Sequence, residues 1–436
     1  MDFITADPIK LYKKYLIPSM GSALAVSIYS FVDTIAVGQS EGELGAAAMA
    51  VICPLFGFMV FLSILCGIGG SVLLSAARGE GKPEKANAFF TIALGMIIVL
   101  TLIFWGLLLL FHDPIFMFLG ADEVILAKVM EYAKWIIWTF PVFIAPTFIG
   151  SFLRNDGAPV LDMAAVIIGG CVNMFGDWFF VFPLGMRMEG AAIATVLGTS
   201  LQVLIMCGHF FRKKCGLRLV KPGNWWRGVR KICLIGVGAG ILDLGTVFIA
   251  VLMNNQIMRY GGPVELAVYG VVSAISPLFQ AFFGGVGQTI QPLVSANCGA
   301  GETERTRLFW RFGLITSLMI GVLTSCLGEF FPVPIARLFM DASPEAIAIV
   351  PSVFQPYFLL FVPLGVTVLA TYYLQAILHG KISMLIALLR SALVSGLLIC
   401  LLPLRWGLAG VWLALPVSEL LVMLIALFYI RKRRLG

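Results

Sequence analysis

The chain has 436 residues, of which 60% are hydrophobic and 12% are charged, and it carries a formal net charge of +7. A soluble domain carries about 25% charged residues, so this composition excludes a soluble globular protein and indicates a chain that lies in a bilayer. The apolar runs are continuous and do not alternate, which excludes a membrane β-barrel. The sequence contains no Walker A motif, no C-x-x-C pair and no Ser/His/Asp constellation. An ATP-driven pump, a zinc site and an enzyme are therefore not indicated.

The apolar runs, taken in chain order, predict an all-α polytopic protein with twelve transmembrane helices. Each run is long enough for the roughly 20 apolar residues that a spanning helix needs. The predicted spans cover residues 15–38, 47–77, 87–111, 128–152, 160–182, 189–211, 232–258, 266–297, 308–331, 346–372, 383–403 and 407–430.

The basic residues are distributed unevenly between the polar segments. If both termini lie in the cytoplasm, the cytoplasmic segments carry 23 Lys and Arg side chains and the outer loops carry 5. Cytoplasmic loops of membrane proteins are enriched in Lys and Arg, so this asymmetry predicts cytoplasmic termini. The net charge then reflects topology and gives no reason to expect a nucleic-acid partner. The longest connection, 212–231, is basic and contains Trp225 and Trp226, which predicts a segment at the membrane surface.

The two halves of the chain repeat one another at a spacing of about 220 residues. The motif LLSAARGEGKPEKA at 73–86, for example, aligns with LVSANCGAGETERT at 293–306. Six helices per half is an even number, so both halves have the same orientation and are related by a pseudo-twofold axis along the membrane normal. We therefore expect an N-terminal six-helix lobe at 1–211, a basic cytoplasmic linker at 212–231 and a C-terminal six-helix lobe at 232–436. This is a transporter architecture, whereas a channel more often repeats as subunits around a pore.

Few ionisable side chains lie inside the predicted spans, where such groups are costly and functional by default. A rise of 1.5 Å per residue places Asp33, Asp177 and Thr195 at a similar depth, roughly 12–14 Å below the outer surface. Asn173 lies four residues before Asp177 and shares its helix face. Two carboxylates, an amide oxygen and a hydroxyl are thus predicted at one level on the first, fifth and sixth helices.

This cluster has the ligand chemistry of a small-cation site. Hard cations prefer oxygen ligands, and carboxylates supply the balancing charge. Two neighbouring carboxylates without a cation would instead hold a proton. We therefore expect a sodium site at Asp33, Asn173, Asp177 and Thr195, for which protons compete. The alternative is a polar network that bridges three helices without binding an ion.

Four motifs in chain order give the sequence a resemblance to a known family. They are FVDTIAVGQ at 31–39, NMFGD at 173–177, EGAAIAT at 189–195 and QPLVSANCGAGETER at 291–305. Over nearly its full length the chain resembles the multidrug and toxic compound extrusion (MATE) family of transporters, whose fold is two lobes of six helices.

The resemblance implies roles for particular residues. In the branches of the family with an N-lobe cation site, the matching residues of the first, fifth and sixth helices bind sodium or protons together with a backbone carbonyl. These positions fall on Asp33, Asn173, Asp177 and Thr195, with Ala191 as the carbonyl. Another branch uses acids in the seventh and tenth helices. Here the tenth predicted helix has no acid beyond its outer rim, so that role is not carried over, and Asp243 in the seventh either lines the cavity or makes a packing contact.

The remaining polar residues in the spans divide into two groups. Arg390 and Glu419 are predicted at equal depth on either side of a turn at 403–406, which favours a structural ion pair. The candidates for contact with an organic substrate are polar side chains on the inner helices: Tyr29, Asn254, Asn255, Gln256, Gln280, Gln288, Gln291, Tyr372 and Gln375.

The resulting expectation is a secondary active exporter in the prokaryotic cell membrane. It would act as a monomer, contact membrane lipid, and exchange small amphipathic or cationic organic compounds for inward sodium or protons, with no other cofactor. The alternative is a lipid-linked oligosaccharide flippase of the same superfamily. A flippase would favour a cavity rich in Arg and Lys for pyrophosphate, whereas only Arg390 lies inside the predicted spans away from the helix ends.

Overall fold

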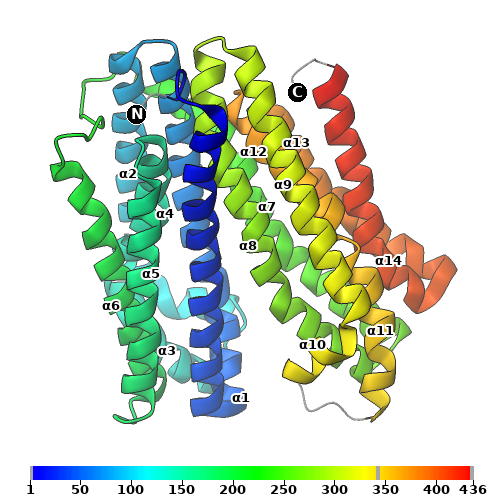
Figure 1. Ribbon diagram of the computed structural model, residues 1–436. Coiled ribbons are helices and arrows are strands. Elements are labelled where there is room, and N and C mark those ends of the chain that lie inside the picture. Colours follow the sequence, from blue (N-terminus) through cyan, green and yellow to red (C-terminus); the bar gives the residue numbers. More distant parts are fainter. Residues whose placement is uncertain (1–2, 340–343, 433–436) are drawn as a thin grey trace. The chain divides into compact units, whose positions relative to one another are not determined.

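The computed structural model describes the backbone of residues 3–339 and 344–432, without the side chains of 34, 38–43, 46, 242–244, 246–247 and 338–339. Over this part of the chain every regular element is a helix, as Figure 1 shows. The α-helices are α1 (Pro8–Gly79), α2 (Pro83–Phe118), α3 (Glu123–Trp138), α4 (Phe140–Asn155), α5 (Pro159–Gly176), α6 (Arg187–Cys207), α7 (Trp225–Tyr260), α8 (Pro263–Gly299), α9 (Thr303–Phe330), α10 (Pro332–Phe339), α11 (Pro344–Phe358), α12 (Phe361–Ala376), α13 (Gly380–Leu388) and α14 (Val394–Lys432). Three short helical segments complete the list: the π-helices η1 (Asp177–Val181) and η3 (Leu389–Leu393), and the 3-10 helix η2 (Gly208–Phe211).

Among the described residues, nine helical stretches are long and apolar enough to cross a membrane, or ten if a bent pair counts as one span. The bent pair is α3 with α4, which meet at an angle of 59° where 128–152 was predicted to form a single span. The bend falls at Thr139, which has non-helical dihedral angles, and Pro141 follows in the first turn of α4. Proline fits the first turn of a helix but not its interior, so the sequence restarts the helix here.

Two predicted spans lie in one helical stretch near the end of the described chain, made of α13, η3 and α14. Residues Gly380–Lys432 form a single stretch that is long and apolar enough to cross a membrane. Gly407 within this stretch has φ 55° and ψ −137°. This positive φ favours glycine because a side chain would clash with the backbone there. The kink lies at the start of the predicted span 407–430.

The described chain divides into two compact units, one of residues 17–240 and one of residues 3–16 with 241–436. In the second unit Tyr15 of α1 packs in an apolar core with Trp310 of α9 and Tyr373 of α12. This packing explains why the first residues of the chain belong with its second half. Within each unit the long helices run side by side (Figure 1).

The segment between α6 and α7 differs in length from the predicted linker. The chain is non-helical from Arg212 to Asn224 apart from a short turn, and α7 begins at Trp225. Residues 225–231, which were assigned to the linker, therefore form the first two turns of α7. Asn224 caps this helix, since its Oδ1 accepts a hydrogen bond of 2.9 Å from the backbone N–H of Arg227.

Candidate functional site: a cation site in the first unit

Two glycines bring the helices of the candidate site together. Gly169 of α5 and Gly198 of α6 face each other so closely that a Cβ atom on either would lie 2.6–2.7 Å from the other's carbonyl oxygen. Small residues allow membrane helices to approach in this way. The crossing lies one turn from Asn173 on α5 and from Thr195 on α6, so it fixes the distance between these two side chains.

The hydroxyl of Thr195 is the centre of the cluster. Its Oγ1 accepts a hydrogen bond of 3.2 Å from Asn173 Nδ2 and lies 3.3 Å from Asp33 Oδ1 of α1 and 2.9 Å from the Ala191 carbonyl oxygen. A hydroxyl has one proton, so it can donate to only one of the last two at a time. The structure thus brings Asp33, Asn173 and Thr195 into direct contact, with Ala191 one turn along α6.

Three buried oxygen atoms of this cluster are left without a hydrogen-bond partner among the described residues. They are both carboxylate oxygens of Asp177 and the amide oxygen of Asn173. The exposed fractions of these two residues are 1% and 3%, so water does not replace the missing partners at the surface. Burying an unpaired carboxylate is costly. These oxygens are therefore chemically suited to a cation or, at the carboxylate, to a proton.

Asp177 has an unusual backbone position. It begins η1, a π-helical turn that interrupts the helix after Gly176. π-Helical turns inside α-helices are frequent at functional sites because they reorient the side chains that follow. Glycine at 176 packs directly against Ala194 of α6. Asp177 therefore begins the interruption directly after the point where α5 packs against α6.

Tyr132 of α3 is a member of the cluster that the sequence did not reveal. Its hydroxyl lies 3.4 Å from Thr195 Oγ1. The side chain is 1% exposed and its ring packs edge-on against Phe56. The only signal in the sequence is a tyrosine in an apolar span. It did not distinguish this residue from a packing aromatic.

The candidate substrate residues are divided between the units. Tyr29 lies in the first unit, where its ring packs on Gly170 of α5. The other candidates lie in the second unit, with Asn254 and Asn255 exposed and Gln280 and Gln288 half-buried.

Gln291 and Gln375 are both buried in the second unit. Gln291 is 1% exposed and donates a hydrogen bond of 3.3 Å to Gln375, which joins α8 to α12. Gln256 is half-buried, and its Oε1 has no partner among the described residues. The side chain of Asp243, the acid of uncertain role in α7, lies outside the described residues.

Two buried ion pairs lie away from this cluster. Arg390 and Glu419 form the pair expected from their depth, at 2.5 Å, and Thr367 donates a hydrogen bond of 2.7 Å to the other carboxylate oxygen. Arg154 and Asp162 form a second pair at 2.7 Å. Their exposed fractions are 8% and 2%, and neither residue was predicted from the sequence to be buried.

A further polar cluster ties the end of α4 to the segment after α6. Asp156 forms ion pairs with Arg78 at 2.7 Å and with His209 at 2.6 Å, and it accepts a hydrogen bond of 3.0 Å from the Gly216 N–H. Burial acts to raise the pKa of Asp156, but His209, Arg78 and the Gly216 N–H together hold the pKa below its ordinary value. Asp156, His209 and Cys215 are close enough to share a metal ion. Arg78 opposes this, because its guanidinium already neutralises the carboxylate.

The chain is similar in sequence to a known protein family and to known transporters. A family model described as MatE matches residues 18–179 and again residues 243–401. The multidrug export protein MepA of Staphylococcus aureus (strain NCTC 8325 / PS 47) is 24% identical over 438 residues, which cover 97% of this chain and 93% of MepA. An FAD transporter of Shewanella oneidensis is 25% identical over 438 residues, covering 96% of this chain and 93% of that protein.

A solved structure has the same fold. It is described as the outward-facing conformation of a multidrug resistance MATE family transporter of the MOP superfamily. Its TM-score is 0.91 at 20% sequence identity, and the match covers 99% of this chain and 97% of that one. The two ranges that the family model matches lie one in each half of the chain.

Proposed function

This chain belongs to the MatE family of multi-pass membrane transporters, and we propose that it is a secondary active exporter of amphipathic or cationic organic compounds. In this proposal the export of one substrate is coupled to the inward movement of sodium or protons through the first unit. The name of the MepA relative, a multidrug export protein, supports the substrate class. The name of the Shewanella relative makes FAD a second cargo to test.

The observation that carries the coupling proposal is the set of buried oxygens without partners beside Thr195. Asp33 and Asp177 place two carboxylates in one buried cluster, and the free oxygens belong to Asp177 and Asn173. A bound cation would satisfy these oxygens and balance the charge. A proton would balance one carboxylate but leave the amide oxygen unsatisfied. Asp33, Asn173, Asp177 and Thr195 with the Ala191 carbonyl are the proposed ligands.

The proposed topology is twelve transmembrane helices in two six-helix lobes with cytoplasmic termini. Nine of the described helical stretches are long and apolar enough to cross a membrane. The bent pair of α3 and α4 supplies a tenth, and α7 adds an eleventh of 36 residues, part of whose middle lies outside the described side chains. Dividing Gly380–Lys432 at the Gly407 kink gives the twelfth. The excess of Lys and Arg in the segments assigned to the cytoplasm supports the orientation.

We further propose that the cation binds in the first unit alone. The repeat spacing aligns Asn173 with Leu393, Asp177 with Leu397 and Thr195 with Leu415, and it aligns Asp33 with about Asn255, which is uncharged. Leucine cannot replace the hydration shell of a cation, so the cost of removing water from sodium would not be compensated there. Substrate contacts are assigned to Tyr29 of the first unit and, in the second, to Asn254, Asn255, Gln256, Gln280 and Gln288, because Gln291 is buried and bonded to Gln375. The change in cation occupancy would drive alternating access of these residues to the two sides.

The test is counterflow in proteoliposomes that contain a fluorescent organic cation. Sodium and proton gradients are imposed in turn, and efflux is followed for the wild type and for Asp33→Asn and Asp177→Asn. Both variants should lose gradient-driven efflux while they insert and stay monodisperse. Leu397→Ala is the matched control, because Leu397 is 58% exposed and its shortening should leave coupling unchanged. Full coupling in Asp177→Asn, or loss of coupling in Leu397→Ala, would overturn the assignment.

A further inference from the structure

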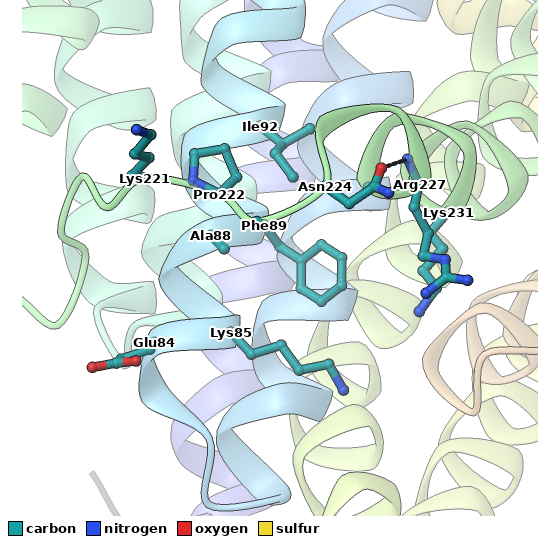
Figure 2. Close-up of a pocket in the computed structure, with 12 residues that line it drawn as sticks. Glu84, Lys85, Ala88, Phe89, Ile92, Lys221, Pro222, Asn224, Arg227 and Lys231 are labelled. Carbon is teal, nitrogen blue, oxygen red and sulfur yellow. Dashed lines mark hydrogen bonds between the residues drawn. The ribbon is translucent and has the colours of Figure 1, made fainter.

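A basic pocket lies in the first unit, apart from the cation site, where α2 begins. It has a volume of about 350 Å³ and is bounded by the first turns of α2, residues 221–224 and the first two turns of α7. Figure 2 shows it with Phe89 and Ile92 of α2 on its inner wall. The pocket therefore has an apolar floor and a rim made by the connection between the two halves of the chain.

Specific contacts hold the two walls of this pocket together. The backbone N–H groups of Arg218 and Val220 donate hydrogen bonds of 3.3 and 3.1 Å to the side chains of Asn87 and Thr91, which lie one turn apart on α2. These bonds fasten the connection along the helix. The pocket rim is therefore attached to α2 before the chain turns into α7.

Close packing fastens the start of α7 in the same way. The ring of Trp225 lies so close to Gly95 of α2 that a Cβ atom on this glycine would be 2.3 Å from the ring. Gly228 of α7 is equally close to Ile92. Both sides of the pocket are thus fixed to α2 by contacts that any larger residue at these glycines would disturb, so the pocket is a built feature of the fold.

The pocket is lined by four cationic side chains and one acid. Figure 2 shows Lys85, Arg227 and Lys231 toward one side, with Glu84 and Lys221 on the other. Lys85 already pairs with Glu80 at 2.8 Å, outside the pocket lining. Arg227, Lys231 and Lys221 form no ion pair with any described residue. The unpaired positive charge makes the pocket attractive to an anion.

The position of the pocket identifies the surroundings of that anion. One wall of the pocket is formed by the first three turns of α2. This helix has 36 residues and is long and apolar enough to cross a membrane. At 1.5 Å per residue, Ile92 lies about 14 Å along this helix from Pro83. Trp226, beside the pocket on α7, is 79% exposed. Exposed tryptophan next to basic residues is typical of the membrane–water interface.

We propose that this pocket binds the headgroup phosphate of an anionic phospholipid, with Arg227 and Lys231 as its main contacts. Basic pockets beside transmembrane helices bind lipid headgroups of this kind. Arg227 can contact two phosphate oxygens at once through its planar guanidinium, while Lys231 supplies a point charge. The apolar floor at Phe89 and Ile92 faces the glycerol backbone, and the acyl chains extend into the bilayer. The site is independent of the cation cluster and of the proposed export.

The test measures lipid retention by the full-length protein, purified in detergent and titrated with phosphatidylglycerol or with uncharged-headgroup phosphatidylcholine, by native mass spectrometry. Phosphatidylglycerol should bind more tightly. Each Lys or Arg near a membrane surface contributes about fivefold to binding of anionic lipid, so Arg227→Gln with Lys231→Gln should weaken it by roughly 30-fold. A second pair, Lys85→Gln with Lys221→Gln, tests the other walls of the same pocket.

The matched control is Lys213→Gln with Lys214→Gln, which removes the same charge from exposed positions of the same connection outside the pocket. This control should retain wild-type affinity. Inorganic phosphate and glycerol 3-phosphate test whether a soluble phosphate is the true ligand. The proposal is overturned if the control loses affinity as the pocket variants do, if phosphatidylcholine binds equally well, or if either soluble phosphate binds as tightly as the lipid with the same dependence on Arg227 and Lys231.

Discussion

Tyr132→Phe is the most discriminating change at the proposed cation site, because it removes one hydroxyl and keeps the ring. The Tyr132 hydroxyl lies 3.4 Å from Thr195 Oγ1, while its ring is buried against Phe56. Phenylalanine preserves this packing. The hydroxyl contacts the proposed ligand Thr195 but is not itself a proposed ligand, so we expect it to act by positioning Thr195.

The expected size of the effect follows from a single hydrogen bond. A hydrogen bond contributes about 0.5–1.5 kcal/mol net, which corresponds to a change of about 2- to 13-fold in the affinity for the coupling cation. The assay is the initial rate of efflux from proteoliposomes, measured over a range of sodium concentrations and separately over a range of pH. The half-saturating concentration of the coupling cation should rise by this factor, and the maximal rate should stay close to that of the wild type.

The control is Tyr12→Phe. Tyr12 donates a hydrogen bond of 2.9 Å to Thr316 in the second unit, so this variant removes a similar tyrosine–threonine contact away from the proposed ligands. It should leave the half-saturating concentration unchanged. The positioning role would be refuted if Tyr132→Phe left this concentration unchanged, if it lowered only the maximal rate, or if Tyr12→Phe had the same effect.

Three further predictions concern the rest of the chain. Asp162→Asn should destabilise the protein by about 3–5 kcal/mol, because it leaves Arg154 buried without its partner, and a thermal unfolding midpoint equal to that of the wild type would contradict this. Asp156→Asn should lower stability at neutral pH, where the ion pairs of Asp156 are intact. Because the pKa of Asp156 lies below its ordinary value in the folded state, its stabilising contribution is present above the unfolded pKa and is lost as pH falls through the folded one. Unfolding midpoints of the variant and the wild type should therefore converge in acid, and a constant difference would argue against it. A reporter that works only in the cytoplasm should be active after Gly436 and silent at Gly120, and the reverse pattern would reject the topology.

The sequence was sufficient for features that depend on depth along a helix. The rise per residue placed Asp33, Asp177 and Thr195 at one level, and the structure brings Asp33 and Thr195 into contact. The same arithmetic paired Arg390 with Glu419. Depth works as a guide because a spanning helix has a fixed direction and a regular rise.

Features that depend on the rotation of a helix or on the geometry of a turn could not be predicted from depth along the helix. Tyr132 lies on a stretch that was expected to be straight and that bends by 59°, so its facing direction could not be calculated from spacing. Arg154 and Asp162 lie at the ends of two consecutive helices and meet across a tight turn. Gly157 in that turn has φ 85°, a conformation that glycine allows. The pairing is a property of the turn and not of either helix.

Asp177 of the first unit and Glu419 of the second differ in how their charge is balanced, and this contrast supports the proposed division of roles. In the second unit Glu419 is already paired with Arg390 and receives a hydrogen bond from Thr367, so its charge is balanced within the protein. In the first unit neither oxygen of Asp177 has a partner among the described residues. A carboxylate balanced by a fixed arginine gains little from a mobile ion, whereas an unpaired buried carboxylate is stabilised by any cation that reaches it. The proposed transport cycle needs a charge that is balanced in one state and unbalanced in another, and of these two acids only Asp177 has no fixed partner among the described residues.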